Sequence, residues 1–202
     1  MSKIWGPMGW ITLHAIAISY PENPTLSEKQ NMKVILELFT DTLTCRYCKD
    51  HFSRILNAYN SQYPNFLNSK HEFFIFTLRA HNEVNRSLDK PIINSVTDCL
   101  QMLKNATQTN TPTIFKDNYM SYLIRVWAHE MTGDALIYKS KSITMRDMLT
   151  NINLDNCFNL EVKEDDITSF KVIIQRRISP LIETLNSLNY KVGFKGGKLK
   201  LR

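Results

Sequence analysis

Two cysteines, Cys45 and Cys48, form the only close cysteine pair in the chain. Thiols at this spacing can close a small disulfide that opens by thiolate attack, or they can supply half of a zinc site. The pair lies at the predicted start of a helix, where unpaired N–H groups favour a thiolate. Arg46 and Lys49 add positive charge there. Zinc would take His51 as a third ligand and His71, His81 or Cys99 as a fourth. No second CxxC sequence occurs, but the spacing of the cysteines alone leaves both redox chemistry and zinc binding open.

Flat rings and amide groups repeat at helical spacing elsewhere in the first half. Trp10 and His14 are four residues apart, and so are His81 and Asn85. Residues at this spacing share one helix face. Such faces suit a planar, hydrogen-bonding cofactor held between helices. A disulfide beside a flavin would form a two-electron relay from thiols to oxygen.

The spacing of apolar residues predicts that helices position these groups. The segments Thr25–Glu28 and Ser69–Glu72 have the capping-box pattern that begins a helix. No βαβ pattern surrounds the cysteine pair, which disfavours a thioredoxin-like fold. The helices expected in the first half cover residues 8–20, 25–43, 45–59, 69–88 and 95–104.

The uncharged, threonine-rich stretch 106–113 is the best candidate for a linker. It predicts one domain over residues 1–105 and a second, mostly helical domain over 114–202. Tyr190 to Arg202 is expected to form either a small hairpin or a frayed basic tail. The helices expected in the second half cover residues 117–131, 145–152 and 167–188, the last interrupted by Pro180.

Composition narrows the class of protein. The chain has 202 residues, 43% hydrophobic and 22% charged, as in ordinary globular proteins. The net charge is +6, but five basic residues lie in 191–202 without any acidic one, so nucleic-acid binding is not expected. No apolar run approaches the ~20 residues of a membrane span, and no signal core is evident. Cys99 and Cys157 are isolated and are expected to be buried thiols.

Four segments resemble, in order, the Erv/ALR-type FAD-linked sulfhydryl oxidases. Residues 5–14 (WGPMGWITLH) are similar to the WGxxxWxxLH opening of that family. Residues 20–25 (YPENPT) are similar to its first loop. Residues 45–52 (CRYCKDHF) resemble its CxxCxxHF active site, and residues 81–91 (HNEVNRSLDKP) resemble its HNxVNxxLxKP flavin motif.

The resemblance implies an all-α four-helix bundle with a short fifth helix that binds FAD, over residues 1–105. It implies a thiol oxidase that forms disulfides in protein substrates and passes electrons to FAD and then to oxygen, giving hydrogen peroxide. Cys45 would be the outer cysteine that substrate thiols attack, and Cys48 would face the flavin. No metal is expected. The positions that match FAD contacts of the family are Gly6, Trp10, His14, His81, Asn82, Val84, Asn85 and Lys90.

The resemblance also implies partners and a location. Members of this family are commonly homodimers, and this short version is most similar to those of large cytoplasmic DNA viruses. We therefore expect a viral enzyme of the host cytoplasm and of the virion. Because no second cysteine pair is present, the substrate is expected to be a protein thiol that reacts directly, such as a thioredoxin-like carrier. The competing hypothesis is a non-enzymatic, zinc-stabilised adaptor that uses Cys45, Cys48 and His51.

Overall fold

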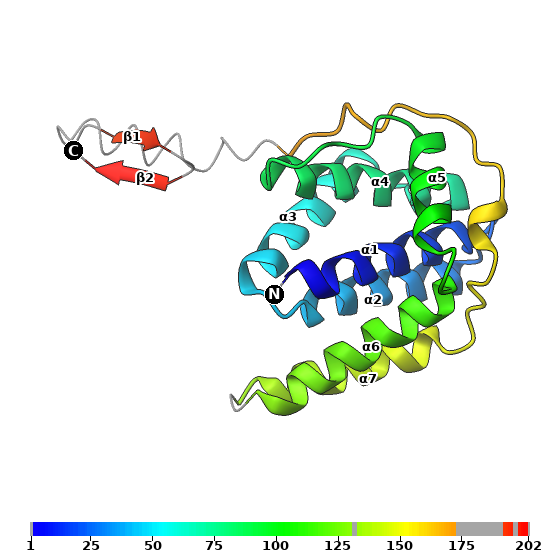
Figure 1. Ribbon diagram of the computed structural model, residues 1–202, viewed down its shortest axis with the longest axis horizontal. Helices are drawn as coiled ribbons and strands as arrows, with labels where there is room; N and C mark the ends of the chain where they lie inside the picture. Colours follow the sequence, from blue (N-terminus) through cyan, green and yellow to red (C-terminus); the bar gives the residue numbers. More distant parts are fainter. Residues whose placement is uncertain (1, 131–132, 173–191, 196–197, 202) are drawn as a thin grey trace. The chain divides into compact units, whose positions relative to one another are not determined.

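The computed structural model describes residues 2–130, 133–172, 192–195 and 198–201 (Figure 1). Residues 1–170 form one compact unit and residues 171–202 another. In the second unit, strands β1 (Val192–Lys195) and β2 (Lys198–Leu201) pair antiparallel, with Val192 opposite Leu201. Of the two alternatives for the C-terminal segment, the small hairpin is therefore the one found.

Five helices of the first unit carry the site, and the prediction of an all-α fold is confirmed. Helix α4 packs on α1, α3 and α5, and α3 also contacts α2. Phenylalanines at 73, 74 and 76 of α4 are fully buried among them. Each of α2 to α5 begins at an N-cap whose side chain accepts a backbone N–H of the first turn, at Thr25, Cys45, Ser69 and Ser95. The five helices are α1 Ser2–Ile18, α2 Leu26–Thr42, α3 Arg46–Gln62, α4 Lys70–Ser87 and α5 Val96–Ala106.

Two further helices, α6 (Pro112–His129) and α7 (Ala135–Leu149), pack against the bundle. Helix α6 lies along α1, and α7 lies along α2 (Figure 1). The expected domain boundary at 106–113 therefore differs from the observed one, which follows residue 170. Residues 107–111 connect α5 to α6 within one compact unit. Thr111 caps α6, and Pro112 occupies the first turn, where a missing N–H costs nothing. Helix α6 packs on α1 of the bundle as well as on α7, so these helices do not form a core separate from the bundle.

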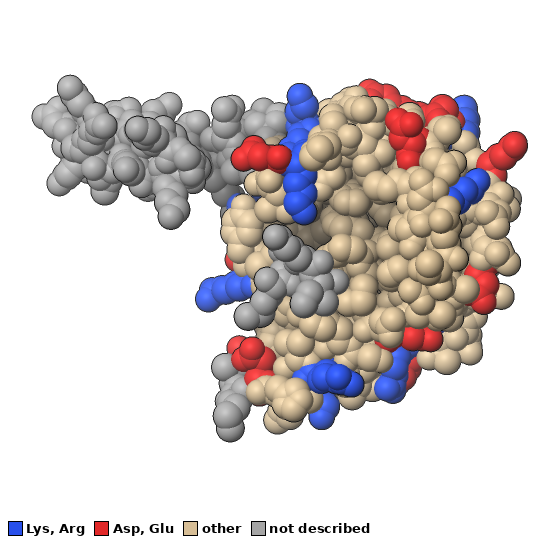
Figure 2. All heavy atoms as spheres, in the orientation of Figure 1, with Lys and Arg blue, Asp and Glu red and all other residues tan. Residues whose placement is uncertain are grey.

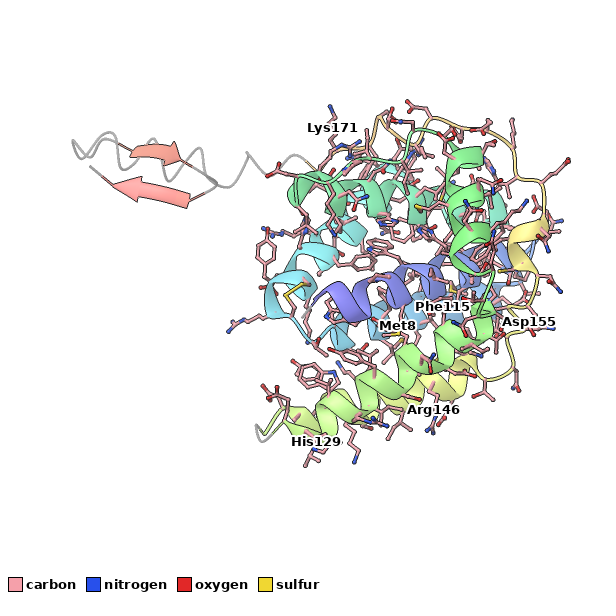
Figure 3. The ribbon with its side chains drawn as sticks, in the orientation of Figure 1. Met8, Phe115, His129, Arg146, Asp155 and Lys171 are labelled. Atoms are coloured by element: carbon pink, nitrogen blue, oxygen red, sulfur yellow. A yellow bond between two sulfur atoms is a disulfide. The ribbon has the colours of Figure 1, made fainter. Side chains whose placement is uncertain are left out.

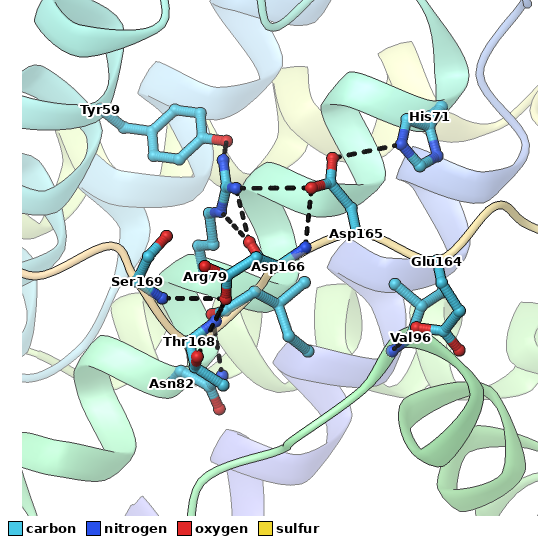
Figure 4. A network of polar contacts seen from close by, with 11 residues as sticks. Tyr59, His71, Arg79, Asn82, Val96, Glu164, Asp165, Asp166, Thr168 and Ser169 are labelled. Carbon is cyan, nitrogen blue, oxygen red and sulfur yellow. Dashed lines mark hydrogen bonds and ion pairs between the residues drawn. The ribbon is translucent and has the colours of Figure 1, made fainter.

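The chain after α7 includes a short 3₁₀ turn, η1 (Cys157–Asn159). A non-helical segment follows, and its residues 166–170 lie against α4. Residues 167–172 are not helical, so the helix expected over 167–188 does not begin there, and 173–188 lie outside the described residues. Side chains of α4 bind the backbone carbonyls of this segment (Figure 4). Arg79 Nε donates to Asp166 O at 3.0 Å, and Arg86 Nη1 donates to Phe170 O at 2.8 Å. These bonds replace the helical hydrogen bonds that the apolar spacing had predicted.

Candidate active site

The two close cysteines are joined by a disulfide at the start of α3 (Figure 3). Their Cα atoms are 5.1 Å apart, and both residues are half-buried. Cys45 is the N-cap of α3, and its Sγ accepts the backbone N–H of Cys48 at 3.2 Å. The unpaired N–H groups of this helix end would stabilise a thiolate released when the disulfide opens.

A cavity of about 460 Å³ lies beside the disulfide and is bordered by α1, α3, α4 and α5. Cys48 lines it and Cys45 does not, so the pair has one member toward the cavity and one away from it. The walls are mostly apolar and aromatic with a few polar groups, as in cofactor sites of this size. The polar and charged side chains on the walls are Tyr47, His51, His14, His81, Asn85, Ser87 and Lys90.

Two flat rings from different helices stack at the cavity wall. The ring centroids of Trp10 on α1 and His81 on α4 are 4.1 Å apart, and the planes differ by 8°. His14 lies one turn beyond Trp10 on the same face, with its ring centroid 5.7 Å away. The spacing of four residues therefore does bring Trp10 and His14 together, and α4 adds His81 to them. The result is a rigid aromatic surface along one side of the cavity.

A chain of hydrogen bonds determines which ring nitrogen of His14 and of His81 carries the proton. The Thr77 hydroxyl lies 2.7 Å from Phe74 O, a contact that requires the hydroxyl proton between the two oxygens. Having donated there, Thr77 Oγ1 must accept from His14 Nδ1–H, at 2.8 Å. His14 Nε2 is then an acceptor and receives the Nδ1–H of His81, at 3.1 Å. His81 Nε2 is left without a proton and without a partner among the described residues, as an acceptor at the cavity wall.

Electrostatics agree with one proton on each ring. Burial, followed by the neighbouring His81, lowers the pKa of His14 well below its usual value. Burial, followed by the charge of Lys90, lowers the pKa of His81 to about 4. Both rings are therefore neutral at neutral pH.

His51, on the first turns of α3, also lines the cavity and is buried. Its Nε2 has no hydrogen-bond partner among the described residues. Burial is the main cause that lowers its pKa, with the charge of Arg54 second. A buried neutral ring with an unused nitrogen is a costly feature that a bound polar group would relieve.

The structure brings most of the predicted site residues to this one cavity. Gly6, Trp10, His14, His81, Val84, Asn85 and Lys90 line it together with Cys48. Asn82 does not line it. Its side chain is fully buried and bonds Ile93 O at 2.8 Å, Ile93 N at 2.7 Å and Ile167 O at 3.2 Å. Asn82 thus holds the chain segments packed against α4, and contact with FAD by any of these residues stays a prediction.

Sequence reasoning missed Thr77, which anchors the histidine chain. It stands four residues before His81, so the helical spacing that singled out Trp10 and His14 could have found it. The walls from α5, formed by Met102, Leu103 and Ala106, were missed as well, because apolar residues at helical spacing predict a core face and nothing more.

Comparison with known proteins identifies the family of this chain. The model of the Erv1/Alr family matches residues 7–122, more than half of the chain. The chain belongs to the Erv1/Alr family. The matched range holds the cavity residues from Pro7 onward and the disulfide, and it ends within α6.

Individual relatives cover the same part. The FAD-linked sulfhydryl oxidase ERV1 of Arabidopsis thaliana is 38% identical over 85 residues, 42% of each chain, so this chain spans about two fifths of that relative's length. The FAD-linked sulfhydryl oxidase of African swine fever virus, isolate Tick/Malawi/Lil 20-1/1983, is 36% identical over 90 residues, covering 45% of this chain and 72% of the relative. Among solved structures, the FAD-binding domain of Erv1 from Saccharomyces cerevisiae is 30% identical, with a TM-score of 0.40 over 50% of this chain and 88% of that one.

The same geometry bears on the other interpretations of the sequence. Among the described residues, no three His, Cys, Asp or Glu side chains gather at a spacing that could hold a metal ion. Cys99 and Cys157 are free and buried, and burial raises the pKa of both thiols to about 12. None of the described helices is both long and apolar enough to cross a bilayer. The face shown in Figure 2 carries basic and acidic side chains interspersed around an uncharged centre.

Proposed function

We propose that this protein is an FAD-dependent thiol oxidase that forms disulfides in protein substrates. One observation carries the proposal. Cys48 of the Cys45–Cys48 disulfide lines a cavity, and the stacked rings of Trp10 and His81 line the same cavity. Family membership and the relatives named FAD-linked sulfhydryl oxidase support this function.

The residues present fit FAD. The stacked rings offer a flat apolar surface, and His81 Nε2 offers an acceptor for a donor group of the cofactor. The unpartnered Nε2 of buried His51 offers a second polar contact. Lys90, exposed and on the cavity wall, would supply positive charge to the phosphates. Trp10, His14, His81, Val84, Asn85 and Lys90 would hold the cofactor, which when bound supplies a two-electron acceptor that oxygen can reoxidise.

The chain's own residues carry the thiol steps. A substrate thiolate attacks Cys45 Sγ, which lies away from the cavity, and the bond to Cys48 breaks. Cys48 leaves as a thiolate, stabilised by the N-terminus of α3. The second substrate thiol then attacks the mixed disulfide and releases Cys45 with a proton. The substrate dithiol has lost two electrons and the cysteine pair has gained them. Re-forming the Cys45–Cys48 bond would give up this electron pair and the proton on Cys45. A bound FAD would supply the two-electron acceptor for it, and the electrons and two thiol protons would end on O₂ as H₂O₂.

We also propose the partners and the setting. A protein thiol, such as that of a thioredoxin-like carrier, would react with Cys45 directly. A homodimer would have to use surfaces other than the faces of α1 and α2 that α6 and α7 cover. Relatives from African swine fever virus and Invertebrate iridescent virus 3 support a viral setting, for which we propose the host cytoplasm and the virion as locations. Fractionation of infected cells and purified virions tests this location, and detection in neither compartment would contradict it.

The decisive experiment is oxygen consumption with dithiothreitol, together with a visible spectrum. The purified protein should be yellow and consume oxygen, whereas Cys48→Ser should remain yellow and consume none. A colourless protein that releases zinc to a chelator would overturn the proposal and favour the adaptor hypothesis.

A further inference from the structure

Trp127, near the end of α6, contacts the residues that lead into the cysteine pair. Its Nε1–H donates to Thr42 O at 3.0 Å. Thr42 ends α2, so its carbonyl is one of the last four, which find no partner inside the helix. Cys45 follows three residues later. The bond therefore fixes the point at which the chain leaves α2. We call residues 42–49 the redox segment.

Lys49 lies at the other end of the redox segment and contacts the same pair of helices. Its Nζ is 3.6 Å from the ring centroid of Tyr138 on α7 and 6.0 Å from that of Trp127. The two rings are themselves 4.7 Å apart. An ammonium group over an aromatic face is attracted by the partial negative charge that the ring quadrupole places on that face. The backbone N–H of Lys49 also donates to Cys45 O at 2.9 Å, so the residue is held by both its backbone and its side chain.

The α6–α7 hairpin is itself anchored on the bundle. Lys141 of α7 forms an ion pair with Asp41 of α2, one residue before the redox segment. Tyr119 of α6 is fully buried and lies directly over Gly9 of α1, where an added Cβ would come within 3.2 Å of the tyrosine ring. The hairpin thus reaches the redox segment from a fixed base. Trp127 and Tyr138 lie beyond residues 7–122, the range that matches the family.

We propose that Trp127 and Tyr138 are positioning residues that hold the redox segment so that Cys48 stays at the cavity wall. This inference rests on the proposed function, because it assigns the hairpin a role in that thiol chemistry. Neither residue lines the cavity, so both act through the segment that they contact. The hairpin then supports the active site from outside the cavity.

Amide hydrogen exchange of the cofactor-free protein tests the positioning directly. Trp127→Ala and Tyr138→Leu should speed exchange at residues 43–49 by at least ~10-fold, because local opening then needs fewer contacts to break. Tyr138→Phe keeps the ring and should match the wild type. Leu149→Ala is the matched control, since it removes a buried side chain from the opposite end of α7. It should leave exchange in the redox segment unchanged.

Reduction of the bound flavin by excess dithiothreitol in a single turnover is the second readout. The dithiol loses two electrons and two protons as the cysteine pair accepts the electrons and passes them on. Flavin reduction should slow by at least ~10-fold in Trp127→Ala and Tyr138→Leu, because Cys48 is misplaced. Wild-type values in both readouts, or equal changes in Leu149→Ala, would overturn the inference. A wild-type protein whose flavin is not reduced would overturn the proposed function instead.

Discussion

His81 Nδ1 lies 3.1 Å from His14 Nε2, which joins α4 to α1 by a hydrogen bond whose direction Thr77 decides. Because Thr77 donates to Phe74 O, both histidines carry their proton on Nδ1. The cavity therefore presents an acceptor at His81 Nε2. A single hydroxyl that does not line the cavity sets the kind of group that the cavity can bind there.

Thr77→Val should reverse this chain. His14 Nδ1–H would lose its acceptor, so His14 should move its proton to Nε2 and donate to His81 Nδ1. His81 would then carry its proton on Nε2 and present a donor to the cavity. Nitrogen chemical shifts of the histidines measure both tautomers. We expect FAD to bind at least ~10-fold more weakly, about 1.4 kcal/mol. Thr77→Ser keeps the hydroxyl and is the control, and unchanged tautomers in Thr77→Val would refute the assigned direction.

Folding stability should fall as the pH falls through the range in which His81 titrates. Burial, followed by Lys90, lowers the pKa of His81 in the folded protein to about 4 from 6.5. Between these values the unfolded chain binds more protons than the folded one, so acid favours unfolding. From His81 alone we expect a loss of about 2 kcal/mol in the free energy of unfolding between pH 7.5 and pH 5. Urea titrations of the cofactor-free protein measure it, and His81→Phe should show a smaller loss.

The two active-site cysteines should differ in access once FAD is bound. In Cys48→Ser the remaining Cys45 lies away from the cavity and should react readily with a bulky disulfide reagent. In Cys45→Ser the remaining Cys48 lies at the cavity wall, where the cofactor would cover it. We expect at least ~10-fold slower modification of Cys48 in the loaded protein, and a smaller difference without FAD, because reaction with the reagent requires access to the sulfur. Equal rates in the loaded variants would contradict the roles assigned to the two sulfurs.

Asn82 and Asn85 are three residues apart on α4, but replacing them should have different effects on folding stability and on FAD binding. Asn82→Ala leaves the buried N–H and C=O of Ile93 without their partner, which should lower the free energy of unfolding by about 2–4 kcal/mol. Asn85 is half-buried, lines the cavity and donates to Pro91 O at 3.0 Å. Asn85→Ala should weaken FAD binding with a smaller loss of stability. Calorimetric titration with FAD and urea unfolding separate the two effects, and a reversed order would contradict the assignment.

Local patterns in the sequence predicted much of this site. Capping residues such as Ser69 mark a helix start because their side chains bind N–H groups only three residues away. Trp10 and His14 share a face because a helix repeats every 3.6 residues, whatever surrounds it. The cysteine spacing likewise allowed a disulfide without any distant contact. These features depend on neighbours within one or two helical turns, so the sequence by itself determined them.

Contacts between distant residues decided the rest. The direction of the hydrogen bond between His14 and His81 depends on Thr77. The side chain of Asn82 is held by the backbone of Ile93 and Ile167, so it does not line the cavity. An apolar stripe predicts that a helix face is buried but does not say against what, so α6 could equally have belonged to a separate domain. Only the packing of α6 and α7 on α1 and α2 brings Trp127 to Thr42. The physical reason is that burial and long-range hydrogen bonds depend on which helix faces meet. Helical periodicity shows which face of a helix is apolar but not which other helix packs against it.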